Sequence, residues 1–153
     1  MTVFSPPAER LYTLEEYLTL EETSAVKHEF HAGKRIEMPG GTFHHNAIGM
    51  NIGYALIQAI DAADKNCHVL SSDMKIFIPE ARRALYPDVA VLCEAPAFYA
   101  DRRDMLLNPL LIVEVLSEST EAYDRGEKFH AYATLPALRE YVLVAQDKPM
   151  VEA

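Results

Sequence analysis

The sequence lacks the features that mark several classes of protein. No apolar run approaches the roughly 18 residues of a membrane-spanning helix, and no signal peptide opens the chain. No internal repeat and no low-complexity linker is present either. These absences argue against membrane and repeat proteins, so we expect a cytoplasmic protein with no membrane partner.

Cysteine and positive charge are both scarce. Only Cys67 and Cys93 are present, and their spacing fits no metal or disulfide motif, so we expect two reduced, buried thiols. The 14 lysines and arginines are outnumbered by 23 aspartates and glutamates, which gives a net charge of −9. DNA affinity comes largely from phosphate contacts, so we do not expect tight, nonspecific DNA binding by a monomer.

The remaining composition is typical of one globular domain. Half of the residues are hydrophobic and 24% are charged. A chain of 153 residues is also long enough to form a substantial core. We therefore assign residues 1–153 to a single domain.

Two short apolar runs stand out in the second half of the chain. They cover residues 89–93 and 110–116, are rich in β-branched residues and are too short for ordinary helices, so they predict buried strands. Asp88 opens the first run, and Glu114 lies near the end of the second. If the strands pair antiparallel, both carboxylates lie at the same edge of the sheet.

Carboxylates within apolar strands need a partner. An ionised, unpaired carboxylate in a core costs several kcal/mol, and two that lie close together repel each other. A hard divalent cation such as Mg²⁺ or Mn²⁺ satisfies both and keeps water ligands of its own. The alternative is that Asp88 caps a turn after Pro87 while Glu114 pairs with an arginine.

A lysine follows the second strand. Lys128 lies in a segment that predicts a helix with Ser119 or Thr120 as its N-cap, and the inward face of this helix can return the lysine to the carboxylates. The alternative places Lys128 on a solvated face, in an (i, i+4) pair with Asp124 worth a few tenths of a kcal/mol. Lys75 is the next candidate for a catalytic lysine.

Helices and strands are also predicted on either side of this centre. Thr13 and Glu16 form a capping box, Gly33 provides the turn of a hairpin, and Thr42 caps a long helix. The apolar stripe of this long helix comprises Ile48, Ile52, Ala55, Leu56 and Ala59. The expected elements are a loose arm over residues 1–10, a helix over 14–21, a hairpin over 27–37, a helix over 43–64, a strand over 69–79 and a strand over 140–145.

Several strings of residues then carry a resemblance to a known family. They are Pro87-Asp88, residues 114–120 (Glu-Val-Leu-Ser-Glu-Ser-Thr), residues 123–129 (Tyr-Asp-Arg-Gly-Glu-Lys-Phe) and residues 136–141 (Pro-Ala-Leu-Arg-Glu-Tyr). With residues 28–34, they resemble the Uma-two family of restriction endonucleases, within the PD-(D/E)XK nuclease superfamily. The resemblance implies an α/β, restriction-endonuclease-like fold with an αβββαβ core, a mixed sheet flanked by helices, and an N-terminal helix and β-hairpin.

The resemblance also implies an activity, which is metal-dependent hydrolysis of DNA phosphodiester bonds. Asp88, Glu114 and the backbone carbonyl of Val115 would hold Mg²⁺ or Mn²⁺. The superfamily motif has a lysine two residues after the glutamate, but this chain has a leucine there, so the resemblance implies that Lys128 is the catalytic lysine. Glu29 joins the catalytic residues by resemblance alone.

Four histidines near the front of the chain suggest a different metal chemistry. They are His28, His31, His44 and His45, but their spacing fits no zinc motif and no cysteine joins them. The long helix also disfavours a histidine-ligated enzyme on a β-barrel. We expect the first three to be exposed or at a helix start, whereas the resemblance places His45 near the active site.

Two expectations concern partners. An acidic monomer engages DNA poorly, so a working nuclease is expected to form a homodimer with two sites. The competing interpretation is a catalytically inactive nuclease-fold protein that serves as an interaction or regulatory domain. The acidic charge and the short C-terminal region favour this second interpretation.

Overall fold

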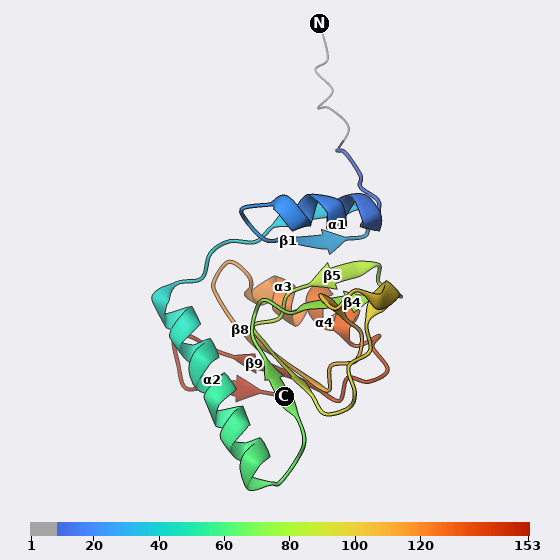
Figure 1. Ribbon diagram of the computed structural model, residues 1–153. Coiled ribbons are helices and arrows are strands. Elements are labelled where there is room, and N and C mark those ends of the chain that lie inside the picture. The colour runs from blue at the N-terminus through green and yellow to red at the C-terminus, as the bar shows by residue number, and fades with distance from the viewer. Residues whose placement is uncertain (1–8) are drawn as a thin grey trace, which may run out of the picture.

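The computed structural model describes residues 9–153 (Figure 1). Most of the arm expected over residues 1–10 therefore lies outside the described residues. The helices are α1 (Leu14–Thr23), α2 (Phe43–Ala62), α3 (Glu121–Arg125) and α4 (Glu127–Tyr132), with a 3₁₀ turn at Tyr99–Asp101. The strands are β1 (His28–His31), β2 (Lys34–Glu37), β3 (His68–Leu70), β4 (Lys75–Ile78), β5 (Arg83–Leu85), β6 (Val89–Leu92), β7 (Met105–Leu106), β8 (Leu111–Val115), β9 (Glu140–Val144) and β10 (Val151–Glu152).

One of the two sheets carries the predicted nuclease core. Its strand order is β10-β9-β8-β6-β3, in which β8 pairs antiparallel with β6 and parallel with β9. Along the chain, the sequence α2, β3, β6, β8, α3–α4 and β9 reproduces the expected αβββαβ order. The predicted mixed α/β architecture is therefore confirmed.

The second sheet was not predicted. Its order is β2-β1-β5-β4-β7, so it joins the predicted hairpin to three strands from the middle of the chain. The single strand expected over residues 69–79 is wrong, because β3 and β4 belong to different sheets. A turn at Ser71 explains the break, since the Ser71 hydroxyl accepts the Asp73 N–H and the Ser71 carbonyl accepts the Met74 N–H.

The N-terminal helix and hairpin form as predicted. The Thr13 hydroxyl accepts the Glu16 N–H, and the Glu16 carboxylate accepts the Thr13 N–H. Between β1 and β2 the turn residues Ala32 and Gly33 both have positive φ, the backbone that a two-residue hairpin loop requires. Tyr17 then fixes α1 to the hairpin, because its buried hydroxyl donates to the His28 carbonyl at 2.6 Å.

The main core lies between the two sheets and is completed by α4. Its buried members include Ile78 from β4, Leu85 from β5, Ala90 from β6, Ile112 from β8 and Tyr132 from α4. The helix α2 packs against the sheet β10-β9-β8-β6-β3, which it contacts through β3, β6 and β8. None of its residues is buried, and two members of the predicted stripe, at positions 55 and 59, are exposed. No helix among residues 9–153 is long and apolar enough to cross a bilayer.

The expected state of the two cysteines is wrong. Cys67 and Cys93 form a disulfide, with their Cα atoms 4.0 Å apart, and both are half-buried. Antiparallel pairing of β3 with β6 sets His68 opposite Leu92, so the cysteines just beyond this pair also face each other. The separation of 26 residues between the cysteines does not indicate a disulfide, because the pairing of the two strands creates the contact.

Candidate active site

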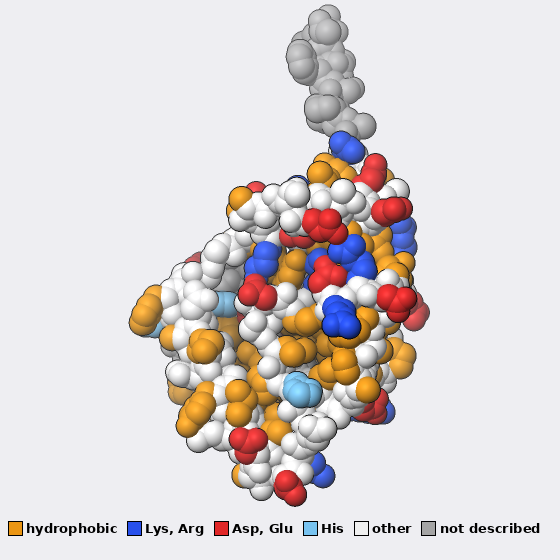
Figure 2. Space-filling model, in the orientation of Figure 1, with side chains coloured by type: hydrophobic (Ala, Val, Ile, Leu, Met, Phe, Trp, Pro, Cys, Tyr) orange, Lys and Arg blue, Asp and Glu red, His pale blue; other side chains and the backbone are white. Residues whose placement is uncertain are grey.

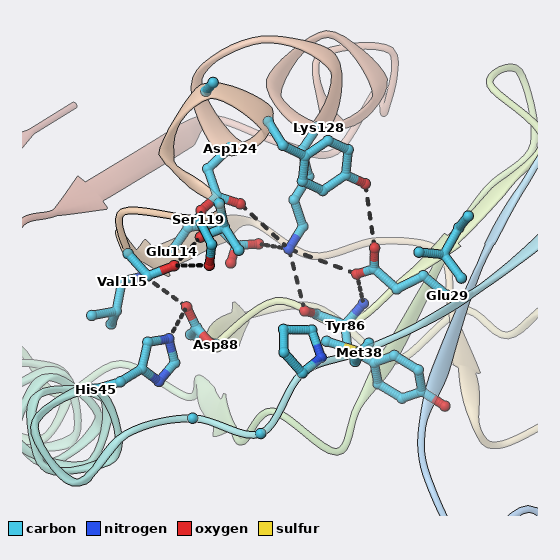
Figure 3. A pocket seen from close by; sticks show the side chains of 18 of the residues that line it. Glu29, Met38, His45, Tyr86, Asp88, Glu114, Val115, Ser119, Asp124 and Lys128 are labelled. Carbon is cyan, nitrogen blue, oxygen red and sulfur yellow. Dashed lines mark hydrogen bonds and ion pairs between the residues drawn. The ribbon is translucent and has the colours of Figure 1, made fainter.

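A cavity of about 690 Å³ opens where the hairpin, the start of α2, the strands β6 and β8, and α3–α4 meet (Figure 3). The residues Glu29, Asp88, Glu114, Val115 and Lys128, all singled out by the sequence, line it. A cavity of this size is typical of a small-ligand or substrate site. The structure therefore brings every sequence-predicted site residue together in one place.

Strand pairing positions the two central carboxylates. Val89 pairs with Val113 in the antiparallel register, so Asp88, just before β6, comes opposite Glu114 in β8. Asp88 Oδ2 accepts the Val115 N–H at 2.7 Å, which fixes this carboxylate at the end of the neighbouring strand. The two side chains therefore belong to the same edge of the sheet, as the antiparallel arrangement requires.

A break in the following helix turns Lys128 inward. The structure has two short helices where one was expected, and Gly126 separates them with φ −106° and ψ −98°. A Cβ at this glycine would meet the Ala122 carbonyl oxygen at 3.0 Å, so a side chain there would be strained. Thr120 holds the N-cap position, but its hydroxyl makes no capping bond and donates instead to Asp124.

The ammonium of Lys128 lies among acidic groups, as Figure 3 shows. Its Nζ atom is 2.8 Å from Glu114 Oε1, 3.7 Å from Glu29 Oε1 and 3.8 Å from Asp124 Oδ1. It also donates to the Tyr86 carbonyl at 3.4 Å. Lys128 is 4% exposed and Asp124 is 3% exposed, so the alternative of a solvated surface pair does not hold.

Burial and charge set the protonation of this cluster. Burial raises the pKa of Glu114 well above its ordinary value. Lys128 lowers this pKa, but repulsion from Asp88 and Asp124 offsets part of that lowering. Burial alone would lower the pKa of Lys128, but Glu114, Glu29 and Asp124 hold it well above its ordinary value. The lysine is therefore protonated, whereas burial holds the pKa values of both Glu114 and Asp124 above their ordinary values.

Glu29 is held by donors from three segments. Its Oε1 accepts the Tyr86 N–H at 3.1 Å, while Oε2 contacts His31 Nε2 at 2.9 Å and accepts the Tyr123 hydroxyl at 3.3 Å. Burial raises the pKa of Glu29, but Lys128, His31 and the Tyr86 N–H together keep it below its ordinary value. Glu29 therefore supplies a fixed negative charge beside the ammonium.

The histidines do not all behave as expected. His31 lines the cavity and His28 is buried against Glu21, so the expectation that both are exposed is wrong. His44 is exposed, as expected. His45 lies in the first turn of α2, where its Nε2 is 3.3 Å from Asp88 Oδ2. Thr42, which caps this helix by accepting the His45 N–H, fixes the position of that turn.

The His45–Asp88 contact predicts a pH-dependent contribution to stability. The hydrogen bond to Asp88 raises the pKa of His45 above 6.5, while the same bond lowers the pKa of Asp88 although burial opposes it. A raised histidine pKa contributes stability that is complete below the unfolded value and is lost as pH rises through the folded value. The lowered aspartate pKa contributes above its own unfolded value, so both contributions are present in mildly acidic solution.

Replacing His45 with glutamine should therefore lower the free energy of unfolding by about 1 kcal/mol near pH 6 and by much less near pH 9. Urea denaturation at the two pH values, with a chelator present, measures the difference. His44→Gln is the matched control, because that ring is exposed on the same helical turn. An equal loss at both pH values would show that the imidazolium makes no ion pair with Asp88.

Sequence reasoning missed part of the site. Asp124 enters the sequence-based prediction only in the alternative interpretation, as a surface partner of Lys128, Tyr123 only as part of a string, and His31 is expected there to be exposed. Tyr123 stacks on His31 with ring centroids 5.5 Å apart, and its hydroxyl lies 3.1 Å from His31 Nε2. The only signal for Asp124 and Tyr123 was their presence in the string 123–129, beside Lys128.

Asp88, Glu114 and the Val115 carbonyl are the groups of this site that could hold a hard cation with water ligands. Among residues 9–153 there is no ready cluster of three or more His, Cys, Asp or Glu ligands. Glu114 Oε1 is buried and accepts no hydrogen bond of good geometry, although it is ion-paired with Lys128. The Val115 carbonyl lies close enough to His45 to help raise the pKa of that ring. Two carboxylates and one carbonyl suit Mg²⁺, which retains several waters.

Comparisons with known proteins identify the family of this chain and a shared fold. The family Uma2, described as "Putative restriction endonuclease", matches residues 14–153. Two Synechocystis proteins, named "Uncharacterized protein sll1609" and "Uncharacterized protein slr1290", are 36% and 41% identical to the chain. The first match covers 90% of this chain and 76% of the relative, and the second covers 86% and 67%.

A solved structure supports the fold. A "putative nuclease belonging to DUF820" from Anabaena variabilis superposes with a TM-score of 0.69 and 17% identity, over 92% of this chain and 83% of that one. At this identity the likeness shows the shared fold alone. Because the family match extends over almost the whole sequence, this chain belongs to the Uma2 family, which is described as "Putative restriction endonuclease".

Proposed function

We propose that this protein is a metal-dependent DNA endonuclease that hydrolyses phosphodiester bonds. The observation that carries the proposal is the buried Lys128 ammonium, which lies within 4 Å of three carboxylates beside Asp88 in an open cavity. The family description supports the reaction class. A structural ion-pair network needs no cavity, whereas a hydrolase needs one for its substrate.

In the proposed site, Asp88, Glu114 and the Val115 carbonyl hold Mg²⁺ or Mn²⁺. A bound ion of this kind supplies Lewis-acid polarisation of the phosphate and a lower pKa for a bound water. Asp88 is oriented for this role by the Val115 N–H and by His45. Glu114 needs the cation most, because burial keeps its pKa high while Lys128 is its one ion-pair partner among residues 9–153.

Lys128 acts on the scissile phosphate in this proposal. Its ammonium orients the attacking water or stabilises the negative charge that develops on the phosphate oxygens. Glu29 holds the ammonium from the opposite side to Glu114, so the lysine is positioned before substrate enters. The raised pKa of Lys128 keeps it cationic across the physiological range.

DNA is the proposed partner, and the net charge bears on how it binds. A chain with charge −9 repels the phosphate backbone except where cations intervene. Divalent metal at the site removes part of that repulsion. A homodimer would add a second site and a longer footprint on the duplex, and we propose that the active form is a homodimer.

A titration of Mg²⁺ and Mn²⁺ against the full chain, with single- and double-stranded DNA, tests the proposal. Cleavage that appears with either metal and disappears with a chelator is expected. Metal binding without cleavage of any tested DNA would favour the alternative, a catalytically inactive nuclease-fold protein that serves as an interaction or regulatory domain. That alternative draws on the acidic net charge and on the complete burial of the lysine.

A further inference from the structure

The helix α2 has an unusual composition for a helix on the surface of a protein. Between Phe43 and Ala62 it contains no lysine or arginine and a single carboxylate, Asp61. One flank faces the sheet, where a Cβ built on Gly53 would lie 3.9 Å from Val69 Cγ1. A helix that packs on one side only is expected to carry charged side chains on the other, whereas the exposed polar residues of α2 are mainly uncharged, among them Asn46, Asn51 and Gln58.

The outward flank of α2 carries large apolar side chains instead. Phe43 is 82% exposed, Met50 74%, Tyr54 62% and Ile57 46%. Their spacings of seven, four and three residues place all four on the same side of the helix. Figure 2 shows hydrophobic side chains gathered along this flank, at the left of the molecule. We call these four residues the α2 patch.

The α2 patch has an area that would form a substantial part of a protein interface. Each of its side chains offers about 200 Å² when fully exposed, so together they leave roughly 500 Å² accessible. This is more than half of the about 800 Å² that each partner buries in a standard protein interface. Isolated exposed hydrophobic residues need no explanation, whereas a continuous patch of this size does.

Charge narrows the choice of partner. Nucleic acid needs basic side chains, and an interfacial membrane helix carries lysine or arginine on its polar face, so the α2 patch suits neither. Two copies of a chain with charge −9 repel each other over most of their surfaces. The α2 patch contains no carboxylate, and Asp61, one turn beyond Ile57 on the same side of α2, lies at its end, so two such copies can meet here with few like charges between them.

The patch is also complementary to itself. When two α2 helices pack antiparallel about a two-fold axis near position 52, Met50 faces the partner's Tyr54 and Ala47 faces the partner's Ile57. A small residue then lies opposite a β-branched one, and a flexible side chain lies against an aromatic ring. We propose that the α2 patch is the interface of a two-fold homodimer of this chain.

Light scattering and sedimentation of the full chain and its variants test this. The parent should be a dimer, and Met50→Lys or Tyr54→Glu should each weaken association roughly a hundredfold, the effect of disrupting a central interface residue. Leu20→Lys is the matched control, because Leu20 is 41% exposed on another helix, α1. This control should remain dimeric, and unfolding curves should show that all three variants fold.

Mixing the two α2 variants tests the partner and the register together. In the proposed dimer, position 50 of one chain faces position 54 of the other. The lysine introduced by Met50→Lys would therefore lie opposite the glutamate introduced by Tyr54→Glu, and an equimolar mixture of the two variants should regain the dimer. A parent that is monomeric, or a dimer that Met50→Lys leaves intact, overturns the proposal. A mixture that stays monomeric overturns the antiparallel two-fold arrangement.

Discussion

Asp88→Asn is expected to reduce DNA cleavage roughly a thousandfold and to abolish the activation of cleavage by low concentrations of Mg²⁺. Asparagine keeps an oxygen that accepts the Val115 N–H, which Asp88 Oδ2 accepts at 2.7 Å, so the strand end stays in place. The substitution removes one of two carboxylates proposed to hold the metal, and metal-bound water supplies several kcal/mol of the rate enhancement. Calorimetric titration with Mg²⁺ and cleavage assays measure the two effects.

Asp73→Asn is the matched control for this variant. Asp73 is also an aspartate in an acidic chain, but its side chain is 85% exposed and pairs with Lys27 outside the cavity. Its substitution changes the net charge equally and should leave cleavage and metal affinity near the parental values. Retention of parental Mg²⁺ binding by Asp88→Asn would remove Asp88 from the metal site and leave its role structural.

The fold was predictable where local pattern and pairing agree. The runs 89–93 and 110–116 were identifiable as strands from their β-branched residues, and they became β6 and β8 with the antiparallel pairing that Asp88 and Glu114 suggested. The capping box at Thr13 likewise predicted where α1 begins. These signals lie within a few residues of the feature that they specify.

Features that depend on distant pairing were not predictable. The strands β5 and β7 have three and two residues, too few for a periodic pattern, and both depend on pairing with strands distant in the sequence, β5 with β1 and β4, and β7 with β4. The disulfide depends on the register of β3 against β6. Likewise, nothing near Glu29 in the sequence shows that its carboxylate accepts an N–H from Tyr86, 57 residues away.

Burial was the least predictable property of the site. The pattern i, i+4 between Asp124 and Lys128 is the same whether the helix face is solvated or enclosed. Enclosure follows from the break at Gly126 and from the hairpin that brings Glu29 over the lysine. Lys75, the other lysine considered from sequence, is also buried, but it lies near Asp104 and outside the cavity lining.

Lys128→Met is expected to reduce cleavage by roughly 100- to 1,000-fold, the range for loss of one donor to the transition state. The burial of the ammonium adds a second effect. Without it, Glu114 and Asp124 are buried carboxylates that have no other ion pair among the described residues, and breaking such a pair costs about 3–5 kcal/mol of stability. Their folded pKa values then rise, so this loss should be largest at neutral pH and smaller in acid, where the carboxyl groups are protonated in both states.

Two further variants separate catalysis from folding. Lys128→Met combined with Asp124→Asn removes one of the uncompensated charges, so it should recover part of the stability and none of the cleavage. Lys128→Arg should restore little activity, because a planar guanidinium does not fit the place of a compact ammonium. Lys65→Met, at an exposed position beyond the end of α2, is the control for loss of one positive charge. Should the folded double variant cut DNA at the parental rate, Lys128 is a structural counter-ion, and the excess of buried carboxylates would serve metal binding alone.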